Sequence, residues 1–96
     1  STSRRQRQMC IRDRYFDRAF IGVNAVDEDR GIMTPGYPEA IKKRIVMQNS
    51  QASYVLADSS KFHVFSNVKV CDLEGFTVIS DRRDSKIGER VKMITA

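Results

Sequence analysis

Apolar and polar positions alternate in blocks along this chain, and the blocks predict strands separated by polar turns. Continuous apolar runs of four or five residues are typical of strands that are covered on both faces. Such runs lie at Ala19–Val23, Ser53–Ala57, Phe76–Ile79 and Val91–Thr95. A weaker run at Val68–Val70 is compatible with either a short strand or a loop.

One helix is predicted between the first two strands. Thr34–Pro38 holds two prolines, which prevent regular structure across it, and its last residue suits the first turn of a helix. Over Glu39–Asn49 apolar residues gather on one side, so Lys42–Arg44 is expected to form a solvated face. The polar segment Asp27–Gly31 is expected to be a turn.

This order of strands, helix and connectors predicts an α/β fold with a parallel sheet and crossover helices. Ninety-six residues leave room for one small domain. Little chain precedes the first predicted strand, so we expect the sheet to be incomplete on its N-terminal side.

The net charge of +5 belongs almost entirely to the first residues. Residues 1–14 carry five arginines and one aspartate, which leaves +1 for the other 82 residues. We expect residues 1–14 to be an unstructured basic leader foreign to the rest of the chain, and residues 15–96 to form the folded unit. Binding of nucleic acid through the leader stays open as an alternative.

Several classes of protein are excluded by composition. No window approaches 18 apolar residues, and no apolar core follows the basic N-terminus, so neither a membrane span nor a signal peptide is expected. Cys10 and Cys71 cannot build a disulfide framework, and their spacing does not suit zinc. His63, the single histidine, is expected to lack partners for a metal site or a catalytic triad. We therefore expect a cytoplasmic protein that needs no metal or cofactor.

Candidate chemistry lies where predicted strands end, because open parallel sheets bind ligands at the carboxyl ends of their strands. Gly22 and Asn24 follow the first strand. The glycine would allow a close approach of ligand or backbone, and the Asn24 amide offers a donor and an acceptor for sugar hydroxyls. The alternative is that Asn24 is an ordinary turn residue.

A second polar group follows the next strand. The Asp58 carboxylate could accept hydrogen bonds from two hydroxyls, and Ser59 and Ser60 offer hydroxyl and backbone N–H donors for a phosphate. Lys61 supplies a positive charge for phosphate or carboxylate. The alternative is a helix cap at Asp58 with Lys61 paired to it on the surface.

These residues form part of a recognisable ordered pattern. From Tyr15 to Ala96 the chain resembles the C-terminal effector domain of DeoR-type transcriptional repressors. The resemblance rests on the segments Phe16–Asn24, Gly31–Pro35, Glu39–Ala40, Leu56–Phe62 and Val78–Asp81. Within the family it looks most like repressors of lactose and galactose-type sugar-phosphate catabolism.

The resemblance implies a domain that senses a phosphorylated sugar, in a homo-oligomeric repressor whose N-terminal winged helix-turn-helix domain binds operator DNA. Neither that domain nor the first part of the sensor is found in this sequence, so the chain looks like a truncated sensor. Gly22, Asn24 and Asp58–Lys61 are then the expected effector-binding residues.

The family in turn resembles ribose-5-phosphate isomerase, which makes a sugar-phosphate isomerase the alternative function. The acidic positions of the enzyme's first motif, Asp-Gly-Ala-Asp-Glu, fall on Ile21, Asn24 and Ala25, and its glycine-rich lysine loop falls on Met33–Gly36. An amide cannot serve as the general base that isomerisation needs. The pattern therefore favours binding without catalysis.

Overall fold

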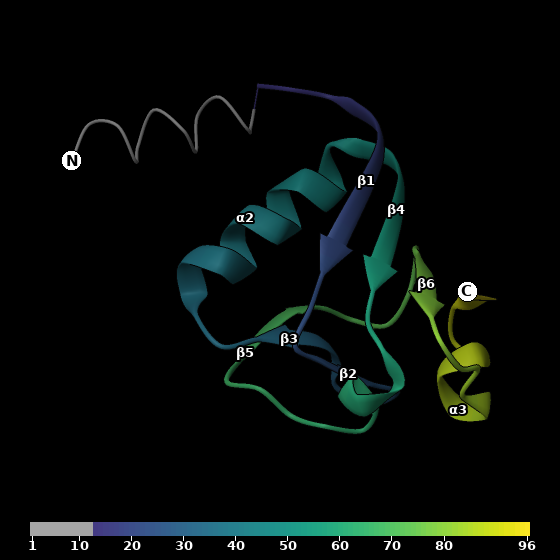
Figure 1. The fold of residues 1–96 in the computed structure, drawn as a ribbon. Coiled ribbons are helices and arrows are strands. Elements are labelled where there is room, and N and C mark those ends of the chain that lie inside the picture. Colours follow the sequence, from purple (N-terminus) through teal and green to yellow (C-terminus); the bar gives the residue numbers. More distant parts are fainter. Residues whose placement is uncertain (1–12) are drawn as a thin grey trace.

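Seven strands form two sheets in the computed structural model, which describes residues 13–96 (Figure 1). In chain order the elements are β1 (Phe16–Gly22), β2 (Ala25–Asp27), β3 (Gly31–Thr34), α2 (Tyr37–Gln48), β4 (Ser50–Leu56), η1 (Ser59–Lys61), β5 (Val68–Cys71), β6 (Thr77–Ser80), α3 (Ser85–Gly88) and β7 (Lys92–Thr95). The predicted leader lies outside the described residues except for its last two positions, so it stays a prediction.

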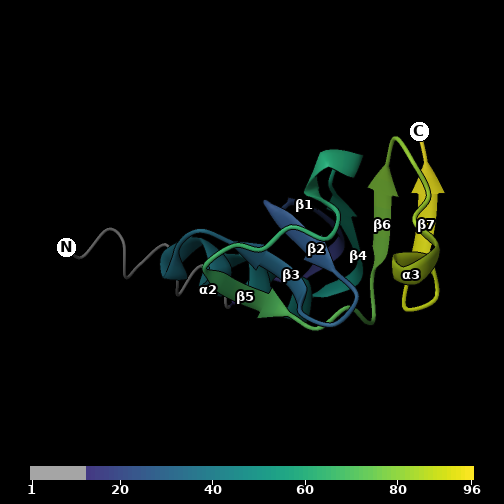
Figure 2. The ribbon, with the colours of Figure 1, turned by 90° about the horizontal axis from the view of Figure 1, so that it is seen from below.

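The larger sheet is parallel and confirms the predicted α/β class. Its strand order is β1-β4-β6-β7, with α2 on the crossover from β1 to β4 and α3 on the crossover from β6 to β7. Figure 2 shows β6 and β7 side by side and pointing the same way, with α3 next to them. All four predicted strands are present, although β1 and β4 each begin three residues earlier than expected, at Phe16 and Ser50.

A second, antiparallel sheet of β2, β3 and β5 was not predicted. It lies beyond the arrowheads of β1 and β4 in Figure 1. β2 and β3 are three and four residues long and every residue in them is buried. Such short segments show no alternation, so their sequence carries no strand signal. The predicted turn at Asp27–Gly31 joins β2 to β3, and the open question at Val68–Val70 resolves as strand β5.

The helix is confirmed but begins at Tyr37, so Thr34–Pro38 is less irregular than predicted: Thr34 ends β3, and Pro38 lies in the first turn of α2. Arg44 is exposed, as expected for the solvated face at Lys42–Arg44, whereas Lys42 and Lys43 are half-buried. Arg44 Nε and Nη2 donate to the carbonyls of Val70 (2.8 Å) and Lys69 (3.0 Å) in β5, so this side chain ties α2 to the small sheet.

The core lies between α2, the small sheet and one face of the large sheet. Residues from each part are completely buried, including Ala40 of α2, Ile32 of β3, and Val55 and Val78 of the large sheet. None of the helices in the described residues is long and apolar enough to cross a membrane.

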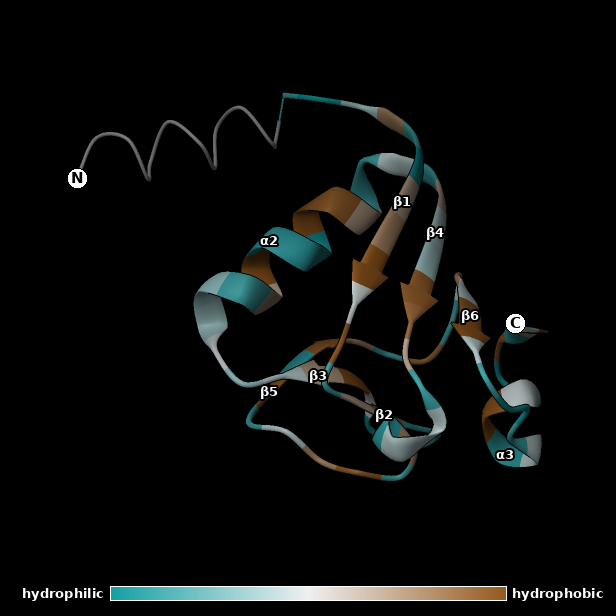
Figure 3. Ribbon diagram, viewed as in Figure 1, coloured by the Kyte–Doolittle hydropathy of each residue, from teal (hydrophilic) through white to brown (hydrophobic). Residues whose placement is uncertain are grey.

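The expectation that both faces of the large sheet are covered is wrong. Along β1 burial alternates, so that Ala19 and Ile21 are buried whereas Phe20 is 60% exposed. Leu56 of β4 and Ile94 of β7 lie on the same open face, because β6 places Ile79 in register with both. β1, β4 and β6 are strongly apolar towards their carboxyl ends (Figure 3), so the hydropathy pattern overstates burial here.

Candidate functional site

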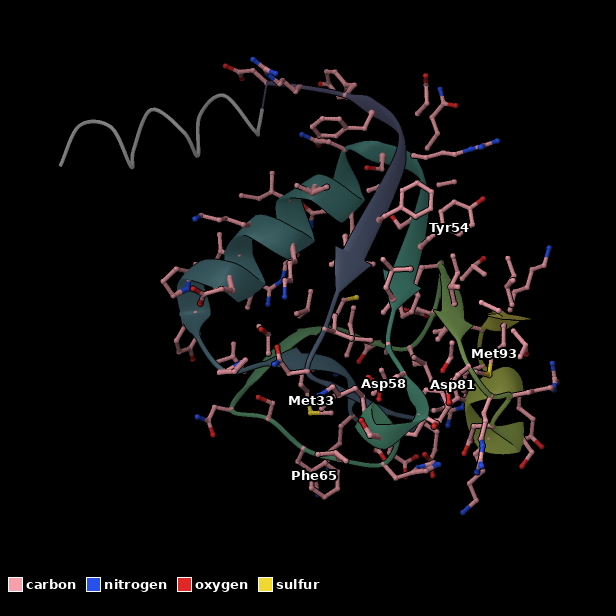
Figure 4. The ribbon with its side chains drawn as sticks, in the orientation of Figure 1. Met33, Tyr54, Asp58, Phe65, Asp81 and Met93 are labelled. Atoms are coloured by element: carbon pink, nitrogen blue, oxygen red, sulfur yellow. The ribbon has the colours of Figure 1, made fainter. Side chains whose placement is uncertain are left out.

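A cleft of about 420 Å³ lies at the carboxyl ends of the parallel strands. Its walls come from the last residues of β4 and β6 and from the residues that follow β1, β4, β6 and β7: Val23, Leu56, Ala57, Asp58, Lys61, Ile79, Ser80, Asp81 and Ala96. The chain keeps sheet-like pairing beyond the strands, since Ala57 N–H donates to the Ile79 carbonyl (3.2 Å). The loops after β4 and β6 are therefore held side by side, and Figure 4 shows Asp58 and Asp81 together below the two arrowheads.

The loop after β4 is organised by carboxylates. Asp58 caps the short helix η1: its Oδ1 accepts from Ser60 N–H (2.9 Å) and from the Ser60 hydroxyl. Asp81, from the loop after β6, accepts from Ser59 N–H (2.6 Å) and from the Ser59 hydroxyl (3.0 Å). The N–H groups of Ser59 and Ser60 thus already donate to carboxylates. An anionic ligand that bound these N–H groups would have to displace the carboxylates of Asp81 and Asp58.

These hydrogen bonds keep both carboxyl groups ionised. The hydroxyl and N–H of Ser60, with the nearby charge of Lys61, lower the pKa of Asp58. The N–H and hydroxyl of Ser59 lower the pKa of Asp81. The cleft therefore presents two carboxylates and one ammonium group, an arrangement that suits a ligand with several hydroxyls near the aspartates and an anionic group near Lys61.

The structure brings together only part of the predicted site. Asp58 and Lys61 line the cleft, and Ser59 and Ser60 build the loop behind it.

Gly22 and Asn24 flank the cleft through Val23 but do not line it. Asn24 Oδ1 accepts from the Thr34 hydroxyl (3.1 Å), which also receives Lys43 Nζ at 3.5 Å. A Cβ on Gly22 would meet nothing within 4 Å, so no described residue requires a glycine there.

Ser80 and Asp81 were missed as site residues, although Asp81 is the main partner of Ser59. A sequence pattern pointed to them: Ser80 and Asp81 follow the apolar run Phe76–Ile79, just as Asp58 and Ser59 follow the apolar run Ser53–Ala57. Neighbouring parallel strands present their carboxyl ends at one edge, so this pattern could have placed the two polar ends together, but the prediction did not use it.

The expectation that His63 lacks partners is wrong. Its Nδ1 lies 2.8 Å from Glu28 Oε2 and 3.6 Å from Asp27 Oδ1, and its Nε2 lies 2.7 Å from Asp84 Oδ2. The hydrogen bond with Asp84 raises the pKa of His63 above its ordinary value of 6.5, against the opposing effect of burial. These partners come from the β2–β3 turn and from the start of α3, which no local spacing could reveal.

The ligand atoms of Asp27, Glu28 and His63 all lie within 4.8 Å of one another, close enough to share a cation. A doubly protonated His63 supplies a positive charge to the same carboxylates, so we assign no metal to this cluster.

Comparison with known proteins agrees with the fold. The family model described as the DeoR C terminal sensor domain matches residues 1–82. The chain is 36% identical over 69 residues to an uncharacterized HTH-type transcriptional regulator, FruR, of Bacillus subtilis, covering 71% of this chain and 28% of that protein.

Two further relatives are also regulators. A putative aga operon transcriptional repressor of Escherichia coli O157:H7 is 32% identical over 74 residues, covering 77% of this chain and 28% of the relative. The HTH-type transcriptional regulator GlpR of Haloferax volcanii is 36% identical over 59 residues, covering 62% and 23%. The chain thus spans about a quarter of the length of these relatives, and the likeness to lactose-type repressors stays a prediction. The chain belongs to the DeoR C-terminal sensor domain family.

Proposed function

We propose that this chain is the sugar-phosphate-sensing part of a DeoR-type transcriptional repressor of carbohydrate catabolism, and that it binds its effector in the cleft at the strand ends. The observation that carries the proposal is the meeting of Asp58, Lys61 and Asp81 in one cleft at the carboxyl ends of β4 and β6. Family membership supports a sensing role for the domain, and the chemistry of the cleft supports the class of ligand.

Each side chain has a role that follows from its charge. Asp58 and Asp81 accept hydrogen bonds from sugar hydroxyls, and Lys61 attracts the phosphate. Ser59 and Ser60 hold the two carboxylates in place and can pass their N–H donors to the ligand when a carboxylate turns towards it. Gly22 and Asn24, at the flank of the cleft, complete the proposed set from the side of β1.

The alternative, a sugar-phosphate isomerase, is disfavoured by the same geometry. A general base is most effective when its pKa lies near the working pH, and the pKa values of Asp58 and Asp81 are lowered away from neutrality. Asn24 carries an amide where the enzyme has a carboxylate. We propose binding without turnover, so the NMR spectrum of added fructose 6-phosphate is expected to stay unchanged over hours.

Regulation requires a longer polypeptide that also carries a DNA-binding domain. The relatives named as HTH-type regulators support such an arrangement. In it, operator DNA is contacted by that other domain, the protein works in the cytoplasm as a homo-oligomer, and effector binding favours one arrangement of the subunits. That coupling exists only if effector affinity differs between the arrangements.

The test is calorimetric titration of the 96-residue chain with fructose 6-phosphate, fructose 1-phosphate and glucose 6-phosphate, beside the free sugars and inorganic phosphate. At least one sugar phosphate is expected to bind more tightly than its sugar or than phosphate alone. Lys61→Ala should weaken that binding about tenfold, the loss expected for one charge-assisted hydrogen bond. Lys69→Ala is the matched control, because Lys69 pairs with Asp72 away from the cleft. Equal affinities in both variants and the parent would contradict the proposed site.

A further inference from the structure

His63 joins three parts of the molecule that are distant in sequence. It lies two residues after the end of η1, and its own N–H donates to the Val26 carbonyl of β2 (2.7 Å). Its ring reaches Glu28 in the β2–β3 turn on one side and Asp84 on the other. Asp84 caps α3 by accepting from Lys86 N–H and Ile87 N–H, both at 3.0 Å. We call His63, Glu28 and Asp84 the histidine clamp.

The clamp holds the two loops that form the cleft. Asp58–Lys61 ends two residues before His63, and Asp81 lies three residues before Asp84 in the loop after β6. The Ser59–Asp81 hydrogen bonds join these loops at the cleft, and the His63–Asp84 bond joins them a second time at their far ends. With two separate contacts, one at Ser59–Asp81 and one at His63–Asp84, the loops cannot rotate relative to each other about a single contact.

The clamp requires a proton on both ring nitrogens. Nδ1 and Nε2 each face a carboxylate oxygen within 2.8 Å, and a neutral imidazole would turn one lone pair towards a negative charge. Glu28 Oε2 is buried and has no hydrogen-bond partner among the described residues. Its charge is balanced by the ion pair with His63 Nδ1 at 2.8 Å, which exists only while the ring is protonated. The other charged groups facing the cluster are Asp27, at 3.6 Å from Nδ1, and Lys86, whose Nζ lies 3.9 Å from Glu28 Oε1.

His63 also has a φ of +58°, which is uncommon for residues other than glycine, although Asn, Asp and His adopt it more often than most. The N–H bond to the Val26 carbonyl and the ring contacts with Glu28 and Asp84 are all made in this conformation.

We propose that doubly protonated His63 is a positioning residue for the ligand cleft, which ties the loop after β4 to the loop after β6 and releases them when it loses a proton. The proposal rests on the proposed function for its effect on the ligand, but the tie itself does not. The sign follows from the raised pKa of His63: the tie is complete below pH 6.5 and is lost as the pH rises through the folded-state value. The pKa of Asp84 is lowered, because hydrogen bonds from Ile87 N–H and His63 outweigh the effect of burial, so the tie is also lost in strong acid.

The first experiment needs no ligand. The His63 ring and the backbone amides are followed by NMR from pH 5.5 to 8.5. The amides of Ser59 and Lys61 in one loop and of Lys86 and Ile87 in the other are expected to titrate with the midpoint of the His63 ring, above 6.5. In His63→Asn, which tolerates the positive φ but carries no charge, these shared transitions should vanish. Lys86→Gln is the matched control, because it removes a cation from the same cluster and should leave the transitions in place.

The second experiment measures the affinity for fructose 6-phosphate, or for the tightest sugar phosphate of the panel, at pH 6 and pH 8. The parent is expected to lose about fivefold in affinity, which is at the low end of coupling between linked sites. His63→Asn should show the same affinity at both values apart from the titration of the phosphate itself, and its curve corrects for that effect.

The outcomes separate the two proposals. Loop amides that ignore the titration of His63 overturn the clamp, whatever binds. Loop amides that follow His63 in a chain that binds no sugar phosphate support the clamp and contradict the proposed function. Equal pH dependence of affinity in the parent and in His63→Asn overturns the effect of the clamp on the ligand.

Discussion

Replacing Gly31 by alanine tests whether the small sheet is held by a close backbone contact. Gly31 is the first residue of β3 and has a φ of +84°. A Cβ there would lie 2.1 Å from the Cys71 carbonyl oxygen at the end of β5, and that oxygen is backbone and cannot swing away. The exchange therefore adds a steric conflict to the ordinary strain of a positive φ.

The comparison with Gly75 isolates the steric part. Gly75 has nearly the same φ, +78°, but a Cβ on it would meet nothing within 4 Å. Both exchanges carry about 1–2 kcal/mol of conformational strain, partly offset by about 0.4–1 kcal/mol from the stiffer unfolded chain. Gly31→Ala carries in addition about 1–3 kcal/mol for the crowded contact.

The assay is urea and thermal unfolding followed by circular dichroism. Gly31→Ala is expected to melt well below Gly75→Ala, since 1 kcal/mol corresponds to about 4–8 °C in a domain of this size. If the two variants unfold within about 0.5 kcal/mol of each other, the approach of β3 to β5 is not the constraint that the structure indicates.

Three further predictions concern the core, the cleft and the buried thiol. Val55 of β4 is fully buried, so Val55→Ala should lower the free energy of unfolding by about 2 kcal/mol, whereas Leu56→Ala, at its half-exposed neighbour, should lower it by clearly less; equal losses would contradict the open face of the sheet. Because hydrogen bonds from Ser59 lower the pKa of Asp81, the stability that they contribute is present above the ordinary value of 3.8 and is lost as the pH falls through the folded-state value. Asp81→Asn should therefore be less stable at neutral pH and lose less on acidification, measured as urea midpoints from pH 7 to 3; parallel curves would argue against the bond. Burial raises the pKa of the Cys71 thiol, so in a Cys10→Ser background its reaction with a disulfide reagent at pH 8 should be slow in the native protein and fast in urea; equal rates would show that the thiol is accessible.

Local sequence patterns were sufficient where a segment interacts mainly through its own periodicity. The four strands of the parallel sheet, the helix after Pro38 and the polar strand end at Asp58–Lys61 could all be predicted, because apolar runs and proline act within a few residues. The family resemblance could also be found from ordered motifs, and the family match confirms it.

The elements that pack against each face of the large sheet could not be predicted from local patterns. Whether a continuous apolar run is covered on one face or on two depends on which elements pack against it, so the exposure of Phe20 and Leu56 was decided by the placement of α2 and the small sheet. The same holds for Arg44, whose role as a donor to β5 depends on a strand 25 residues away.

The sequence by itself determined the class of the fold, the order of its main elements and the chemistry offered at the end of each strand, because backbone propensity and side-chain type act locally. Only the tertiary structure decided that Asp81 meets Ser59 and that His63 meets Glu28 and Asp84. These contacts span about 20 to 35 residues of chain, and the charges become partners only when parallel strands and their crossovers bring distant loops to one edge of the sheet.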